Sequence, residues 1–447
     1  MISRSPAPAR SGRAAVLVVC ICALLCVSAG TRASDQVDLR AELEEPATLT
    51  MWAWVPGIEK EVALFEKAHP NIQVKVVNVG QGPAEYPKLR TALKSGQGAP
   101  DVAQIEFQFI PSFVITGSLL DLSAFFPVAE FKRSYPEWVA RQVVIDGHIW
   151  AIPQDTGPMG MLYRRDLLEQ AGIPPPRTWK EFADAARAYH QKNPESYLTN
   201  LPPNEPAQWI GFFWQAGARP FGQPARGQLR MKLNDPAAKK VATFWEQLVK
   251  EGVVSTDPDW TDRWYQGLAS GRYASWLTAA WGPVNLQGTA KKTSGSWAAA
   301  PLPQWSEGGH ASGNWGGSTS AVLASTAHPA AAAELARWIN QEHEPALKLA
   351  TEQFLFPASN AILTDPAFIE QGAPFYGGQK VNKLFVEISN TVAKDFTWSP
   401  IHDFIASSGN DTFGAAIAKG GDMGAALDAW NEAAVKYAKE HGYKVVK

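Results

Sequence analysis

The order of hydrophobic and polar positions near the start of the chain predicts alternating strands and helices. Ile58, Val62 and Phe65 recur at the spacing of one buried helix face, whereas Ile72 and Val74 alternate with polar neighbours as in a strand. The predicted elements are a strand at 48–52, a helix from 58 to a break at 69–71, a strand at 72–78, a helix at 87–94 and a strand at 100–105. Strands separated by helices pair in parallel through right-handed crossovers, so we expect an α/β sheet covered on both sides.

Residues typical of helix ends predict four further helices. Thr178 and Glu181 form a capping box, and Asp235 followed by Pro236 gives an N-cap with a proline in the first turn. The predicted helices run from 178 to 191, from 235 to a glycine at 252, from 328 to 339 and from 423 to 440. Residues 320–323 read as a strand, and the middle of the chain is expected to be largely helical. A chain that passes between two such units and returns forms two lobes, with ligand sites at their interface.

Residues 1–33 have the pattern of a secretory signal peptide. Three arginines precede an apolar run from Ala14 to Val27, and no acidic residue occurs before Asp35. The run is short for a bilayer-spanning helix, and small residues follow it at candidate cleavage sites. We therefore expect an exported protein, with a flexible tether at 34–46 between the cleavage site and the fold.

The three cysteines, Cys20, Cys22 and Cys26, all lie within this apolar run. The rest of the chain therefore offers no disulfide, no cysteine-ligated metal and no cysteine nucleophile. Cys26 is a candidate lipoprotein cysteine, but Leu25 stands where a small residue normally precedes such a cysteine. Two alternatives stay open: a protein anchored to the membrane by lipid at Cys26, and one released freely into the periplasm or at the outer face of the membrane.

Composition and charge narrow the possible function classes. With 45% hydrophobic and 19% charged residues, the chain reads as a soluble globular protein long enough for two domains. Removing residues 1–33 removes four arginines and changes the net charge from −2 to −6. No run of lysines or arginines builds the positive field that nucleic acid requires, so no nucleic-acid partner is expected. The eight histidines lack metal-ligand spacing, and no glycine-rich phosphate loop follows a strand, so we expect no metal and no cofactor.

Eighteen tryptophans are the most informative feature of the composition. Trp54, Trp281 and Trp315 lie beside or near glycine or proline, where a rigid flat side chain can form a platform for an apolar face. One face of a pyranose, lined with C–H bonds, is a suitable partner. The alternative is packing in a core, which is the better interpretation for tryptophans on predicted helices, such as Trp179 and Trp245.

Landmarks spread over nearly the whole chain after the signal peptide resemble those of one family. They include LTMWAW (49–54), LFEKAHPNIQVKVV (64–77), GAPDVAQIE (98–106), GHIWAIPQDTGPMGMLYRRDLLEQAGI (147–173) and GGSTSAVLASTAHPAAAAELARWI (316–339). On these segments the chain resembles extracellular solute-binding protein family 1, the carbohydrate-capturing subunits of bacterial ABC importers.

The resemblance implies an α/β fold of the periplasmic-binding-protein type (type II), with two lobes, a hinge and a ligand cleft between the lobes. It places the crossings between lobes near 152–153, near 314–317 and after 356. The N-terminal lobe would comprise 47–153 and 317–360, and the C-terminal lobe 154–316 and 361–447. It further implies a monomer that captures a sugar, in particular an oligosaccharide, without catalysis and delivers it to the permease subunits of an ABC transporter.

The resemblance and the predicted strand ends together indicate the ligand-binding residues. Glu106 ends a predicted strand where the family commonly has Asp, and a carboxylate accepts several hydrogen bonds from sugar hydroxyls. Trp281 matches a position often occupied by the family's stacking aromatic, and Trp54 is expected to approach the cleft while Trp52 faces the core. The expected ligand-binding residues are Trp54, Gln81, Glu106, Phe109, Gln154, Asp155, Thr156, Trp214, Trp281, Asn314, Trp315, Gly316 and Gly317.

Two other functions remain open from the sequence. A secreted glycoside hydrolase would also use indole platforms and two carboxylates, for which Glu106 and Asp155 are candidates, although no hydrolase motif surrounds them. A member of the same family could bind a non-sugar solute, but the carboxylate cluster of a polyamine site and the paired tyrosines or histidines of an iron site are not evident. His402 could contact a ligand at the rim, and the simpler interpretation is a surface histidine.

Overall fold

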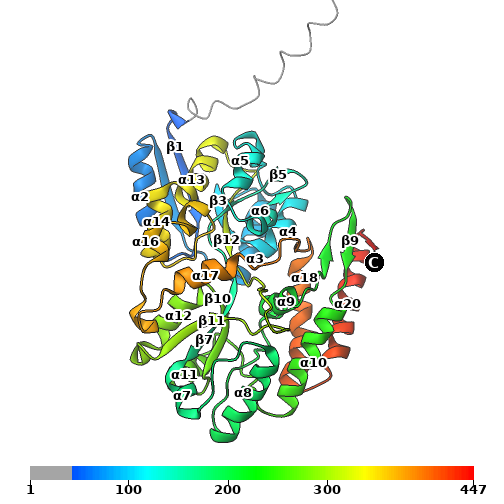
Figure 1. Ribbon diagram of the computed structural model, residues 1–447. Coiled ribbons are helices and arrows are strands. Elements are labelled where there is room, and N and C mark those ends of the chain that lie inside the picture. Colours follow the sequence, from blue (N-terminus) through cyan, green and yellow to red (C-terminus); the bar gives the residue numbers. More distant parts are fainter. Residues whose placement is uncertain (1–42, 447) are drawn as a thin grey trace, which may run out of the picture. The chain divides into compact units, whose positions relative to one another are not determined.

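Two β-sheets form the framework on which the helices pack (Figure 1). The computed structural model describes residues 43–446, which lie within one unit of the chain. The first sheet has the strand order β2-β1-β3-β12-β6 and the second β10-β7-β11, with two smaller sheets, β13-β9-β8 and β4-β5. The strands are β1 (Ala47–Trp52), β2 (Ile72–Val77), β3 (Val102–Glu106), β4 (Val144–Ile145), β5 (His148–Ile149), β6 (Ile152–Pro153), β7 (Met159–Arg164), β8 (Phe221–Gly222), β9 (Gln228–Met231), β10 (Ser275–Ala279), β11 (Trp297–Pro301), β12 (Ser318–Val322) and β13 (Lys444–Val446).

Helices connect these strands and form the C-terminal part of the described chain. The α-helices are α2 (Glu59–Ala68), α3 (Tyr86–Ser95), α4 (Ile110–Ile115), α5 (Val128–Arg133), α6 (Glu137–Val143), α7 (Arg165–Ala171), α8 (Trp179–Lys192), α9 (Pro206–Gln215), α10 (Pro236–Lys250), α11 (Asp262–Ser270), α12 (Gly282–Thr289), α13 (Pro329–Gln341), α14 (His343–Thr351), α15 (Asn360–Leu363), α16 (Pro366–Ile369), α17 (Val381–Ser389), α18 (His402–Gly409), α19 (Ala415–Lys419) and α20 (Met423–Glu440).

The first sheet contains the parallel strands that the sequence predicts. β1 pairs in parallel with β2, from Ala47 opposite Ile72 to Trp52 opposite Val77, and with β3 on its other side. α2 packs on β2, and α13 packs on β12 and β1. β12 is antiparallel to both β3 and β6, because it enters the sheet directly from the region of the second sheet and not through a helical crossover, which parallel pairing requires.

Helices α7 to α12 lie in the middle of the chain as expected, but residues 159–301 also contain the second sheet, which the sequence pattern did not predict. β7 pairs antiparallel with β10 on one side and with β11 on the other. Every residue of β10 is buried, and β7 has a single partly exposed position. A strand covered on both faces shows no alternation of polar and apolar residues, so its sequence looks like that of a buried helix segment.

The predicted helix boundaries agree with the structure where a capping signal marks them. Thr178 Oγ1 accepts a hydrogen bond from the N–H of Glu181 at 3.1 Å, and Glu181 Oε2 accepts one from the N–H of Thr178 at 3.2 Å. Asp235 caps α10 by accepting from the N–H of Ala237 at 2.9 Å, and α20 has the predicted bounds. These bonds satisfy N–H groups that the first turn of a helix leaves unpaired.

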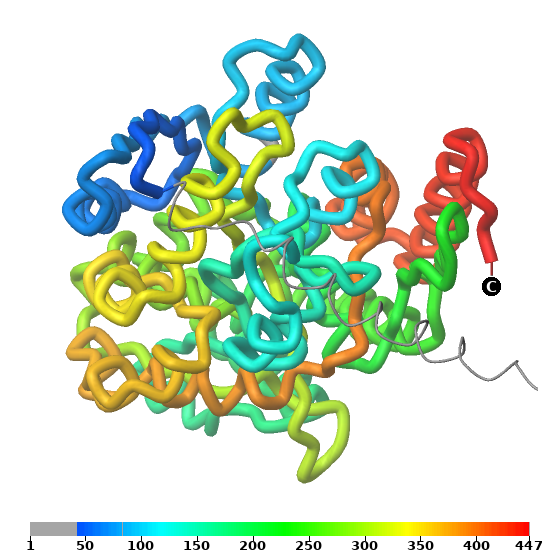
Figure 2. The backbone as a smooth tube through the Cα atoms, turned by 90° about the horizontal axis from the view of Figure 1, so that it is seen from above, coloured from blue at the N-terminus to red at the C-terminus, as the bar shows by residue number. Residues whose placement is uncertain are grey.

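Segments from distant parts of the chain meet around the C-terminal helix. α20 packs against α10 and α18, and β13 pairs in parallel with β9. In Figure 2 the red helix accordingly lies beside the green segment that contains β9. Trp179, Trp245 and Trp430, which lie on helices of this packed region, are buried, in agreement with the packing interpretation.

The predicted signal peptide, the three cysteines with the candidate lipid site at Cys26, and tether residues 34–42 lie outside the described residues. At the start of the described part, the carbonyl of Glu44 accepts a hydrogen bond from Asn71 Nδ2 at 3.0 Å. Between residues 43 and 446, none of the helices combines the length and the hydrophobicity that a transmembrane helix needs.

Candidate ligand-binding site

A cavity of about 1470 Å³ opens at the carboxyl edge of the first sheet. Its walls come from segments adjoining strands of both sheets: Trp54 follows β1, Glu106 ends β3 and Trp281 follows β10. The C-terminal ends of parallel strands lie at one edge of a sheet, which is where open α/β sheets bind ligands. Ser318 reaches the same edge because β12 runs antiparallel and begins there.

The structure brings most of the predicted ligand-binding residues to this cavity. The ones that line it are Trp54, Gln81, Glu106, Phe109, Asp155, Trp281, Trp315, Gly316 and Gly317. The other four, Gln154, Thr156, Trp214 and Asn314, are buried and do not line it.

Trp214 lies in the core and not in the cavity, which corrects its expected place. Its ring stacks on that of Phe396, with centroids 3.9 Å apart and planes 8° apart, and its Nε1 donates to the carbonyl of Ala393 at 3.0 Å. α9 is buried along almost its whole length, so its indoles face other aromatic rings. Trp214 therefore packs in the core, which is the alternative to a ligand platform given above for tryptophans.

Gln154, Thr156 and Asn314 also differ from their expected place, because they lie in three segments that run side by side behind the cavity. We call these segments, 154–158, 314–317 and 356–357, the ribbon; isolated β-bridges join them. The N–H of Thr156 donates to the carbonyl of Phe356 at 2.9 Å, and Asn314 Oδ1 accepts from the N–H of Gly157 at 2.9 Å. Gln154 Oε1 accepts from the hydroxyl of Ser318 at 3.3 Å. These bonds join the segments to each other and to β12.

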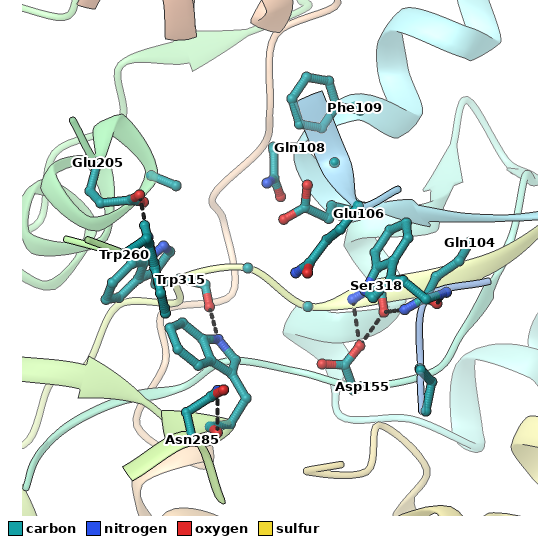
Figure 3. Close-up of a pocket in the computed structure, with 18 of the residues that line it drawn as sticks. Gln104, Glu106, Gln108, Phe109, Asp155, Glu205, Trp260, Asn285, Trp315 and Ser318 are labelled. Carbon is teal, nitrogen blue, oxygen red and sulfur yellow. Dashed lines mark hydrogen bonds between the residues drawn. The ribbon is translucent and has the colours of Figure 1, made fainter. Parts of the chain in front are cut away.

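Asp155 reaches the cavity, but Ser318 holds its carboxylate (Figure 3). Asp155 Oδ1 accepts hydrogen bonds from the Ser318 N–H at 2.8 Å and from the Ser318 hydroxyl. Gln104 extends this network, since its Nε2 donates to Ser318 Oγ at 2.9 Å and its Oε1 accepts from the N–H of Trp54 at 3.0 Å. Burial raises the pKa of Asp155, and the bonds from Ser318 oppose that rise. The network fixes the start of β12 against β3 and the end of β1.

Glu106 is the second carboxyl group on this side of the cavity. The hydroxyl of Tyr86 donates to Glu106 Oε2 at 3.1 Å and accepts from the Glu106 N–H at 3.0 Å. Burial raises the pKa of Glu106 to about 7, and the hydrogen bond from Tyr86 partly offsets this rise. Behind it Glu85 has no exposed surface, and burial followed by the charge of Glu106 raises the pKa of Glu85 to about 8. Near neutral pH the Glu106 carboxyl is therefore able to accept or, when protonated, to donate a hydrogen bond.

Three indoles form the wall on the other side. Trp281 and Trp315 have ring centroids 4.8 Å apart at 77°, and Trp281 Nε1 donates to the carbonyl of Trp315 at 2.9 Å. Trp260 packs against both, with centroids 5.9 and 6.3 Å away. Its Nε1 donates to Glu205 Oε1 at 2.6 Å, and burial raises the pKa of Glu205 to about 8. Figure 3 shows Trp260 and Glu205 across the cavity from Glu106. The cavity thus has a flat apolar wall and a hydrogen-bonding wall.

His402 is buried and lines the cavity, so the interpretation as a surface histidine is wrong, and a contact with the ligand stays a prediction. Its ring makes edge-on contacts with Phe109 and Trp398, with centroids 5.1 and 5.0 Å away. Burial lowers the pKa of His402 to about 3, so the ring is uncharged at neutral pH. The uncharged ring packs against Phe109, which lines the cavity as predicted.

Trp260, Glu205 and Tyr86 line the cavity but were not identified from the sequence. Tyr86 is the first residue of α3, and Glu205 directly precedes α9, so a helical pattern alone marks neither side chain as a cavity residue. Trp260 belongs to a loop between α10 and α11. The Asp-Pro-Asp sequence before it signals a turn, which was the available clue to an indole on a loop.

The charged residues that line the cavity have one sign. Glu106, Asp155, Glu205 and Asp403 contribute carboxyl groups, and among the described lining residues there is no lysine or arginine. Within residues 43–446, no cluster of three or more histidine, cysteine, aspartate or glutamate side chains could hold a metal ion. Such a lining suits ligands with hydroxyl or amine donors and repels anions.

The match to a known family agrees with this geometry. Residues 52–342 match the family described as bacterial extracellular solute-binding protein, and the chain belongs to this family. A lactose-binding protein of Rhizobium radiobacter is 28% identical over 366 residues, which are 76% of this chain and 81% of the relative. An arabinooligosaccharide-binding protein of Halalkalibacterium halodurans is 22% identical over 83% of this chain and 85% of the relative.

Solved structures of similar proteins have the same architecture. The ABC transporter associated binding protein from B. animalis subsp. lactis Bl-04, in complex with β-1,6-galactobiose, superposes with a TM-score of 0.81 at 29% identity, covering 90% of this chain and all (100%) of that one. The galacto-N-biose-/lacto-N-biose I-binding protein of Bifidobacterium longum, in complex with lacto-N-biose, has a TM-score of 0.79 at 27% identity, covering 90% of this chain and 99% of that one. The fold is that of the two-lobe periplasmic sugar-binding proteins.

Proposed function

We propose that this protein is an exported solute-binding protein that captures an oligosaccharide between two closing lobes and delivers it to the permease of an ABC transporter. The observation that carries the proposal is the cavity with the Trp281, Trp315 and Trp260 rings on one wall and Glu106 on the other. Indole faces pack against the C–H face of a sugar ring, while carboxyl groups hold its hydroxyls. The relatives that bind lactose, galactobiose and lacto-N-biose add to this support.

The proposed N-terminal lobe comprises 47–153 and 317–360, and the proposed C-terminal lobe 154–316 and 361–447. The sheets support this division, because all strands of the first sheet fall in the first set and all strands of the second sheet fall in the second set. The ribbon contains two of the proposed crossings, and β6 leads into it. Ligand contacts from both lobes exist only in the closed state, so the ligand shifts the population toward it.

Binding without catalysis is the proposed activity. A glycoside hydrolase needs one carboxyl group as acid and a second as base or nucleophile. Of the pair suggested by the sequence, Asp155 is engaged by the N–H and hydroxyl of Ser318, which argues for a structural task at the cavity edge.

We further propose a monomer without cofactor, released or anchored outside the cytoplasm. The mass of the mature N-terminus will distinguish lipid at Cys26 from a free chain.

The test is a binding screen on the purified mature protein. Lactose, β-1,6-galactobiose, lacto-N-biose and arabinooligosaccharides are each added in a thermal-shift assay, and each hit is measured by calorimetry. A sugar that binds only the folded state raises its melting temperature. Absence of any shift across neutral mono- and oligosaccharides would contradict the proposal. In parallel, incubation followed by an assay for new reducing ends should show none, since their appearance would identify a hydrolase.

A further inference from the structure

Two aromatic residues of the cavity have a backbone conformation that their side chains disfavour. In residues 43–446, the residues other than glycine with positive φ are Asp146 at 53°, Trp260 at 66° and Phe354 at 59°. Asp146 has a local explanation, because it precedes Gly147 in the two-residue turn between β4 and β5, where aspartate tolerates this conformation. The side chains of tryptophan and phenylalanine do not favour this conformation, so the surrounding structure has to hold it.

The same two residues stand out by their exposure. Among the described residues, the large hydrophobic side chains that are exposed are Ile115, Trp260 and Phe354, with 46%, 39% and 48% of their surface accessible. Trp260 and Phe354 both line the cavity, whereas Ile115 does not. Two independent properties, the left-handed backbone and the exposed ring, therefore coincide at two positions of one cavity.

The surrounding structure holds both backbones in place. On either side of Phe354, the N–H of Gln353 donates to the carbonyl of Lys348 at 3.3 Å and the N–H of Leu355 to that of Leu349 at 3.1 Å. These bonds tie the segment back onto α14, so Phe354 cannot relax to negative φ without breaking them.

Trp260 is held in a similar way by its neighbour. The N–H of Asp259 donates to Asn204 Oδ1 at 3.1 Å, and Asn204 Nδ2 donates to the carbonyl of Asp259 at 3.1 Å. Together with the bond from its Nε1 to Glu205, this pair fixes both the backbone and the ring of Trp260.

The two rings belong to different sides of the cavity. Trp260 packs on Trp276 of β10, in the second sheet, with centroids 6.1 Å apart. Phe354 follows α14, which packs on α2 and α13, the helices that cover the first sheet. A ligand in the cavity therefore has one exposed ring supplied from each sheet.

We propose that Trp260 and Phe354 are paired contact residues that close on the C–H faces of a bound sugar from the two lobes. The proposal rests on the proposed function and names two specificity-determining residues for it. The strained backbone places each ring at the cavity with part of its apolar surface exposed for the ligand to cover, and Trp260 also packs against neighbouring indoles. Strain of this kind persists when the surroundings enforce it, and it is concentrated at ligand sites.

The experiment compares Phe354→Gly and Trp260→Gly with wild-type protein, using lactose, β-1,6-galactobiose and lacto-N-biose as probes. Glycine adopts positive φ freely, so the unliganded melting temperature of Phe354→Gly should equal or exceed that of wild type. Its affinity for the sugar that wild type binds should fall at least about tenfold, as expected for loss of a stacking contact. Phe354→Tyr keeps the ring and should keep the affinity.

Two matched controls separate the ring from the backbone. Asp146→Gly relieves the same backbone conformation away from the cavity, and Ile115→Ala removes an exposed apolar side chain away from it; both should bind as wild type does. Wild-type affinity in Phe354→Gly, or a melting temperature well below that of wild type, would overturn the inference. If Trp260→Gly loses packing with its neighbouring indoles and melts at a lower temperature than wild type, the comparison of Phe354→Gly with Phe354→Tyr tests the inference. Failure of wild type itself to bind any probe would instead refute the proposed function.

Discussion

Glu85 should give the stability of this protein a specific pH dependence. It has no exposed surface, and its pKa is raised from 4.5 to about 8 by burial and by the charge of Glu106, against the smaller effect of Lys88. A carboxyl group with a raised pKa binds its proton more tightly in the folded state than in the unfolded chain. The stability that it contributes is therefore present at low pH and is lost as the pH rises through the folded pKa.

The magnitude follows from the range over which only the folded protein holds the proton. Between about pH 6 and about pH 9 the unfolded chain has already released it, while the folded protein releases it near pH 8. About two pH units of difference correspond to about 3 kcal/mol of unfolding free energy. Glu85→Gln has no proton to release, so the stability of wild type relative to this variant should fall by about 3 kcal/mol across the range.

Urea unfolding of the unliganded protein, followed by tryptophan fluorescence at a series of pH values, measures this difference. The buried amide of Glu85→Gln adds a cost that does not change with pH, so the slope and not the offset is the test. Glu59→Gln, which alters an exposed carboxyl group of α2, is the matched control and should run parallel to wild type. Glu106→Gln removes a negative charge that raises the pKa of Glu85, so in this variant the loss of stability should move to lower pH.

 A difference between wild type and Glu85→Gln that is the same at every pH would refute the reasoning.

Three further predictions concern the cavity and the fold. Trp281→Ala should weaken sugar binding by at least about 2 kcal/mol, roughly thirtyfold in calorimetry, because it removes an indole face and leaves the carbonyl of Trp315 without its donor; unchanged affinity would refute its place as a contact. Thr178→Ala should lower the unfolding free energy by about 1 kcal/mol in urea, since the capping box is lost, and an unchanged midpoint would argue against that cap. Gly157→Ala should destabilise by about 3 kcal/mol or more, because a Cβ there would lie 1.9 Å from the carbonyl oxygen of Trp315. Gly288→Ala, with open space around its position in α12, is the control and should be as stable as wild type or up to about 1 kcal/mol more stable, because alanine favours the helix.

Elements with local signals could be predicted from the sequence, and elements set by tertiary contacts could not. The helices at 178–191 and 423–440 carry their own caps, so their bounds follow from neighbouring residues. β10 and β11 have no such marks: the first is buried throughout, and the second reads WAAAP, which favours a helix by composition. Their strand conformation comes from pairing with β7, which no local pattern encodes.

The same distinction applies to the cavity. Glu106 and Trp54 were placed correctly because they follow predicted parallel strands, whose ends share one edge. Trp260 was missed because its place depends on its neighbour Asp259, which is held by Asn204, 55 residues before Asp259 in the chain. Trp214 was misplaced because a tryptophan near a glycine looks the same whether its partner is a ligand or Phe396.

The ribbon of segments 154–158, 314–317 and 356–357 has a mechanical consequence. Separate connections would let one lobe twist or slide over the other. Connections that are bridged to one another instead bend together, like a single leaf spring, about one hinge axis and resist shear. In the proposed lobe division, closure then has one degree of freedom, the angle of this leaf. Different sugars could change how far the leaf bends, and they could not change the direction. A permease that recognises the closed form would therefore need to sense a single angle, whatever cargo produced it.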